Sequence, residues 1–139
     1  MTSGPEEGAS IGADVSRWRI LIVDDEPDVR EIMCDYLTSV GHLVEVAPSG
    51  REAVARVREE DAAYDVALVD WNMPGIGGRE VIETLKELHP ETVVVVTTGD
   101  QVDALRQPRR ASRWDAVVRK PFALRDLVRE IDALMASPP

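Results

Sequence analysis

Short aliphatic runs that recur between helical patterns constrain the fold of this chain more than any other feature. Five runs are predicted to be strands, and they lie at 19–23, 43–46, 64–69, 92–97 and 116–119. A strand that is covered on both faces reads as a nearly continuous apolar run, whereas a half-exposed strand alternates apolar with polar residues. The runs therefore predict a sheet that is buried on both sides.

Helical patterns fill the intervals between these runs. In 27–40, apolar residues that include Ile32 fall on one face, Pro27 opens the pattern and Gly41 closes it. Ser49-x-x-Glu52 is a capping-box signal for the second helix. The remaining helices are predicted after the glycine-rich loop at 74–78, between 102 and 113, and from 124 onward.

The order of the elements predicts the topology. Strands that alternate with helices form a parallel sheet with right-handed crossovers, so the fold class is α/β, a doubly wound five-stranded parallel sheet. The fourth helix, between Val102 and Arg113, contains Pro108. Proline removes a helix hydrogen bond and clashes with the preceding turn, so we expect this helix to be short or broken.

The length and the composition indicate one folded domain. A chain of 139 residues with 44% apolar residues can bury a single core without disulfides or a structural metal. Residues 1–17 are small, polar and punctuated by glycine and proline, so we expect a flexible arm. The folded domain is predicted at 18–136, and 137–139 is predicted to be a frayed end.

Charge and hydropathy exclude several classes of partner. The formal net charge of −10 would repel a phosphate backbone, which disfavours direct nucleic-acid binding. The longest valine run, 93–96, is too short to span a bilayer. The single cysteine, Cys34, cannot form an internal disulfide, and no apolar leader follows a basic start. We therefore expect a cytoplasmic protein that binds neither nucleic acid nor membranes.

Polar side chains follow four of the five predicted strands. Asp24 and Asp25 follow the first strand, Asp70 the third, Thr98 the fourth and Lys120 the fifth. The carboxyl ends of parallel strands meet at one edge of a sheet, where sites form in this fold class. Three neighbouring carboxylates repel one another unless a hard cation such as Mg²⁺ lies between them. The hydroxyl and the ammonium suit phosphoryl oxygens, so the set suits phosphoryl transfer to a carboxylate.

Each of these residues also has a structural interpretation. An aspartate at a strand end is commonly a turn former or a helix cap, and Asp25 before Pro27 fits that role. A Lys-Pro pair such as Lys120–Pro121 usually marks a surface turn. Taken singly, the structural interpretation is favoured for every residue. Their joint placement at the ends of the strands favours a site.

Four motifs carry a resemblance to a known family. VDDE at 23–26, VDWNMPGIGG at 69–78, VVVVTTG at 93–99 and VVRKPF at 117–122 resemble the motif set of response-regulator receiver domains, the CheY-like family. The resemblance covers roughly 19–136. It implies a flavodoxin-like sheet with strand order 2-1-3-4-5. It also implies a signalling domain of two-component systems that is phosphorylated on aspartate and is not an enzyme.

The resemblance implies a phosphoacceptor and a metal site. Asp70 would accept the phosphoryl group. Asp25 and Asp70 would bind Mg²⁺ directly, Asp24 would bind it through water, and Asn72 through its backbone carbonyl. The implied phosphodonor is a sensor histidine kinase or a histidine phosphotransfer protein, and the downstream protein target is unknown.

The same resemblance implies how the phosphoryl group is held and read. Thr98 would be the switch hydroxyl, and Lys120 would bind the phosphoryl group, with a cis peptide to Pro121. Family members often carry an aromatic residue three positions before the lysine, where this chain has Val117. The nearby Trp114 is out of register with that position. The usual aromatic switch is therefore in question, but phosphorylation is not.

Other interpretations use the same residues differently. A phosphatase of the haloacid-dehalogenase type needs an Asp-x-Asp pattern after the first strand, but here Asp24 and Asp25 are adjacent and Glu26 follows. A flavodoxin-like FMN binder needs a phosphate-binding loop there, which these acids would oppose. The chain could also be a receiver cut from a hybrid kinase or a multidomain regulator. We favour a single-domain regulator that acts through protein contacts.

Overall fold

A computed structural model describes residues 17–59, 61, 63–99, 104–105 and 114–136. In these residues the chain forms a five-stranded parallel sheet with the order β2-β1-β3-β4-β5, which confirms the predicted fold class and topology. The strands are β1 (Arg19–Val23), β2 (Leu43–Ala47), β3 (Val66–Asp70), β4 (Val93–Thr98) and β5 (Ala116–Arg119). The helices are α1 (Pro27–Val40), α2 (Gly50–Val57), α3 (Gly78–Leu88) and α5 (Leu124–Ala136).

Three expectations fall outside the described residues. They concern most of the arm at 1–17, the frayed end at 137–139, and the short or broken fourth helix between 102 and 113, of which only 104–105 are described. These expectations stay predictions.

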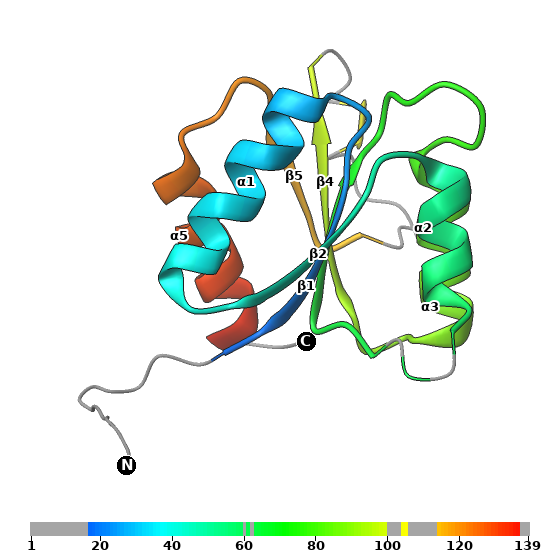
Figure 1. Ribbon diagram of the computed structural model, residues 1–139, viewed down its shortest axis with the longest axis horizontal. Coiled ribbons are helices and arrows are strands. Elements are labelled where there is room, and N and C mark those ends of the chain that lie inside the picture. The colour runs from blue at the N-terminus through cyan, green and yellow to red at the C-terminus, as the bar shows by residue number, and fades with distance from the viewer. Residues whose placement is uncertain (1–16, 60, 62, 100–103, 106–113, 137–139) are drawn as a thin grey trace.

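Helices cover both faces of the sheet. Figure 1 shows α1 and α5 on one side and α2 and α3 on the other. Successive strand side chains point to opposite faces. In β1, Leu21 and Val23 pack with the α2–α3 side, and Ile20 and Ile22 pack with the α1–α5 side. Both faces are buried, which explains why the strands read as unbroken aliphatic runs.

Local signals set the helix ends as the sequence indicated. The hydroxyl of Ser49 accepts a hydrogen bond from the Glu52 backbone N–H at 3.1 Å and caps the start of α2. Pro27 occupies the start of α1. Gly41 ends α1 with φ of 115°, a conformation that glycine adopts without the steric cost of a side chain.

Several predicted strand ends differ from the structure by one or two residues. β3 runs over Val66–Asp70 instead of 64–69, and β4 over Val93–Thr98 instead of 92–97. β2 extends one residue further, to Ala47. Backbone pairing between β3 and β4 continues up to these carboxyl ends. Asp70 pairs with Thr97, and the backbone N–H of Trp71 donates to the Thr97 carbonyl. Asp70 and Thr98 are therefore the last residues of their strands.

The predicted apolar face of α1 is wrong for Ile32. Met33 and Leu37 are buried against the sheet, but Ile32 is 55% exposed. Adjacent residues on a helix differ by about 100° in direction. The position of Met33 in the core therefore turns Ile32 toward the surface.

Two glycines bring the loop after β3 close to its neighbours. A Cβ on Gly50, the first residue of α2, would collide with the backbone carbonyl of Ile76. A Cβ on Gly78, the first residue of α3, would lie 2.8 Å from the Asp70 carbonyl oxygen. Loop 71–77 is thus packed tightly against the end of β3 and the start of α2. Among the described helices, none is both long enough and apolar enough to cross a membrane.

Candidate functional site

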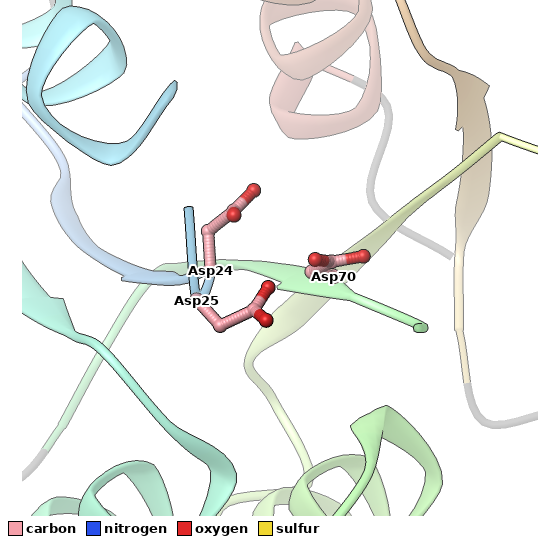
Figure 2. Close-up of side chains that lie close together, drawn as sticks. All are labelled: Asp24, Asp25 and Asp70. Atoms are coloured by element: carbon pink, nitrogen blue, oxygen red, sulfur yellow. The ribbon is translucent and has the colours of Figure 1, made fainter. Parts of the chain in front are cut away.

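Three carboxylates meet at the carboxyl edge of the sheet. Asp24 and Asp25 directly follow β1, and Asp70 is the last residue of β3 (Figure 2). One oxygen from each of the three lies within 4.8 Å of the others. Asp24 is fully buried and Asp70 is 4% exposed. Two of the three carboxylates therefore have little access to water, and Asp25 is partly exposed.

Two of the aspartates also shape the turns that follow their strands. Oδ1 of Asp24 accepts a hydrogen bond from the Glu26 backbone N–H at 2.9 Å. Oδ1 of Asp70 accepts one from the Asn72 backbone N–H at 3.1 Å. Both are turns of the type in which an aspartate binds the backbone two residues later. Asp24 and Asp70 thus each use one carboxylate oxygen to form a turn, as the structural interpretation of strand-end aspartates predicted. The other oxygen of each carboxylate is available to the site.

Lys120 brings the positive charge of the site. Its Nζ lies 2.9 Å from Asp24 Oδ2, 3.0 Å from Glu26 Oε1 and 3.5 Å from Asp70 Oδ2. The peptide between Lys120 and Pro121 is cis. Glu26 is a member of this cluster that the sequence analysis did not assign to the site. Its place directly after the aspartate pair was the available signal.

Thr98 and Asn72 form the remaining polar pair at this edge. The Thr98 hydroxyl is fully buried and donates to Oδ1 of Asn72 at 3.0 Å. Asn72 is exposed, in the loop that follows Asp70. The structure therefore places all six residues of the predicted site at one edge of the sheet.

The environment of Asp70 favours its neutral form. The pKa of Asp70 is raised to about 6, chiefly by burial and also by the charges of Asp24 and Asp25. The charge of Lys120 and the Asn72 backbone hydrogen bond act in the opposite direction. The pKa of Lys120 is raised, because its hydrogen bonds to Asp24 and Glu26 outweigh the lowering effect of burial.

The donor set fits a hard divalent cation. The three aspartates and Glu26 supply four carboxylates, and among the residues that the structure describes Lys120 is the cation paired with them. Mg²⁺ prefers oxygen ligands at about 2.0–2.1 Å in octahedral geometry, which separates neighbouring ligands by about 3 Å. Carboxylate oxygens grouped within 4.8 Å therefore need only small movements to bind one ion.

An aromatic pair extends from the end of β3 toward β5. The rings of Trp71 and Trp114 meet edge to face, with centroids 5.4 Å apart. The indole N–H of Trp114 donates to the Leu105 carbonyl at 2.9 Å. Val117 is buried in the same cluster of side chains. Sequence reasoning noted that Trp114 is out of register with the usual aromatic position, and it missed the contact with Trp71.

Comparison with known proteins assigns the family. The sequence matches the response regulator receiver domain over residues 20–132. This chain belongs to the response regulator receiver domain family. The receiver protein CpdR of Brucella abortus is 33% identical, and the match covers 84% of this chain and 96% of CpdR. The transcriptional regulatory protein TcrA of Mycobacterium tuberculosis is 35% identical over 96% of this chain, but the match covers only 52% of TcrA.

Solved structures of receiver domains have the same fold. The response regulator TrrA of Thermotoga maritima, in complex with Mg²⁺-BeF, superposes with a TM-score of 0.71 at 29% identity. That match covers 84% of this receiver domain and 98% of TrrA. TrrA in its complex with the histidine kinase ThkA superposes with a TM-score of 0.70, at the same identity and with 85% and 98% coverage.

Proposed function

We propose that this receiver domain accepts a phosphoryl group on Asp70 in a Mg²⁺-dependent reaction. The observation that carries the proposal is the position of the buried Asp70 carboxylate, next to the Asp24–Asp25 pair on one side and to Lys120 on the other. An oxygen of Asp70 attacks phosphorus, and the phosphorus–nitrogen bond of a phosphohistidine breaks. The bonding electrons stay on the imidazole, and an acyl phosphate forms.

The metal site of the proposal uses the acidic edge. Asp25 and Asp70 would hold the ion directly, with Asp24 contributing through water and Asn72 through its backbone carbonyl. Bound Mg²⁺ would offset the repulsion between the acids and the incoming phosphoryl oxygens. Support comes from the oxygen donors grouped within 4.8 Å and from the Mg²⁺-BeF complex of TrrA.

Thr98 and Lys120 complete the proposed site. The Thr98 hydroxyl turns from Asn72 toward a phosphoryl oxygen, and the Lys120 ammonium binds another. Phosphoryl transfer depends mainly on positioning and on charge stabilisation, and these two donors supply both. The acyl phosphate stays on the domain, and we expect the domain to signal through protein contacts.

The proposed phosphodonor is a histidine kinase or a histidine phosphotransfer protein. TrrA binds the kinase ThkA, which supports a partner of this class. An apolar groove of about 660 Å³ lies beside Lys120 and offers a place for the donor to dock. Val29, Ile32 and Phe122 line it, and the exposure of Ile32 leaves apolar surface for a partner.

A small phosphodonor tests the proposal without the kinase. Acetyl phosphate with Mg²⁺ should add one phosphoryl group to the wild type, measured by intact mass. Asp70→Asn should remain unlabelled, and the exposed Asp35→Asn on α1 should label like the wild type. Labelling of Asp70→Asn at the wild-type rate would show that another residue is the acceptor.

A further inference from the structure

We propose that Glu26 is a positioning residue that holds Lys120 in a resting position, so that Lys120 must leave Glu26 when Asp70 is phosphorylated. The inference rests on the proposed phosphorylation of Asp70 and adds a control on its rate. The Glu26 carboxylate pairs with Lys120, and among the described residues no ion pair or hydrogen bond joins Glu26 to Asp70. It acts through the lysine.

The local geometry of Glu26 shows that its carboxylate is committed to the lysine. Glu26 occupies the N-cap position of α1, with extended backbone angles, but its side chain makes no capping hydrogen bond. A side chain at this position ordinarily binds a free backbone N–H of the first turn. Here the Oε1 atom is instead 3.0 Å from Lys120 Nζ.

The distances around Lys120 define the resting position. Asp24 and Glu26 are at 2.9 and 3.0 Å, within hydrogen-bond range, and Asp70 is further away at 3.5 Å. An ammonium has three N–H donors, and two of them are engaged by the residues that follow β1. The lysine is therefore hydrogen-bonded to the residues that follow β1, and its ion pair with Asp70 is the longest of the three.

The two bonds differ in how easily they break. Asp24 is fully buried, whereas the side chain of Glu26 is 59% exposed. Water competes for an exposed carboxylate and weakens its ion pair, but a buried carboxylate keeps its partner. We therefore expect Lys120 to keep its contact with Asp24 and to lose its contact with Glu26 when it moves toward the phosphoryl group.

This arrangement predicts an asymmetric kinetic effect. Loss of the Glu26 charge removes a contact that exists only before phosphorylation, so the barrier to phosphorylation falls. The phosphorylated state has already lost the contact, so hydrolysis of the acyl phosphate keeps its rate. A residue that merely stabilised the fold or changed the net charge would not separate the two rates in this way.

The test compares Glu26→Gln with Asp28→Asn. Both remove one negative charge near the start of α1, but no contact joins Asp28 to Lys120. The rates of labelling by acetyl phosphate and of dephosphorylation are measured at a Mg²⁺ concentration that saturates each protein, together with the unfolding midpoint. Glu26→Gln should label roughly 1.5- to fivefold faster than the wild type, the range expected for loss of an exposed ion pair, with unchanged dephosphorylation. Asp28→Asn should match the wild type in both rates.

Other outcomes separate the two proposals. An unlabelled wild type, or a labelled Asp70→Asn, would overturn the phosphorylation of Asp70. A labelled wild type with Glu26→Gln no faster than Asp28→Asn would overturn the resting contact alone. Slower labelling of Glu26→Gln, or an equal rise in both of its rates, would overturn it as well.

Discussion

Glu45 in β2 and Asp70 in β3 are both acidic residues of the sheet, but their surroundings shift their pKa values in opposite directions. Glu45 accepts hydrogen bonds from Arg19, Arg56 and Tyr64, so both of its oxygens have donors. These partners hold the pKa of Glu45 below its usual value although burial alone would raise it. Asp70 instead has its pKa raised to about 6.

The difference teaches which acidic group is available for chemistry. Around Glu45 two guanidinium groups face one carboxylate, and the guanidinium of Arg19 also stacks over the Tyr64 ring at 4.8 Å. Such a cluster is electrostatically complete and needs no further ligand. Around Asp70 the acids outnumber the cations, so an added cation or a protonation event relieves repulsion. Shifted pKa values of this kind are typical of functional sites.

The largest effect should come from removing the charge of Asp70. The folded state raises its pKa from 3.8 to about 6, so the ionised group is less favourable in the folded chain than in the unfolded one. Wild-type stability is therefore lost as the pH rises from about 4 through 6. Two pKa units correspond to about 3 kcal/mol, so Asp70→Asn should stabilise the metal-free protein by about 2–3 kcal/mol at pH 8.

Urea unfolding in a chelator at several pH values measures this difference. The stabilisation of Asp70→Asn should disappear below about pH 4, because the wild-type group is then neutral in both states. Equal stability of the two proteins at pH 8 would contradict the raised pKa.

An intermediate effect of opposite sign is expected at Glu45. Glu45→Gln leaves Arg19 and Arg56 without their shared carboxylate, which is about one-third exposed. We expect a loss of about 1–2 kcal/mol, because part of the interaction is screened by water. The rise of the unfolding midpoint with Mg²⁺ should persist in this variant and vanish in Asp25→Ala. If Glu45→Gln lost the Mg²⁺ response too, the two acidic regions would not be independent.

The sequence predicted the strands and the grouping of the site because both depend on short-range patterns. Aliphatic runs mark buried strands, and the carboxyl ends of parallel strands share one edge of the sheet. The sequence alone therefore predicted that Asp24, Asp70 and Lys120 lie together. The contact of Glu26 with Lys120 could not be predicted in this way. The two residues are 94 positions apart, and their distance depends on two loop paths that no local pattern encodes.

The exposure of Ile32 and the ring contact of Trp71 with Trp114 escaped prediction for a related reason. A helical pattern gives the direction of the apolar face to within about one residue, and Ile32 lies at its margin. The Trp pair depends on side chains that leave the ends of different strands and meet over one face of the sheet. Tertiary packing alone decides such contacts.

The smallest expected effect is spectroscopic and concerns how far a change at Asp70 travels. Trp71 follows Asp70 directly, and its ring touches Trp114, whose indole N–H is bonded to the Leu105 carbonyl. Mg²⁺ with beryllofluoride, a mimic of the phosphoryl group, should therefore shift the Trp114 indole N–H resonance. Trp71→Leu removes the ring contact and should reduce that shift, because the change is relayed through packed side chains. Trp18 packs with the α1–α5 side, so its indole resonance is an internal control that should stay in place. An undiminished Trp114 shift in Trp71→Leu would mean that the change reaches β5 by another route, such as through Lys120, which lies one residue beyond the end of that strand.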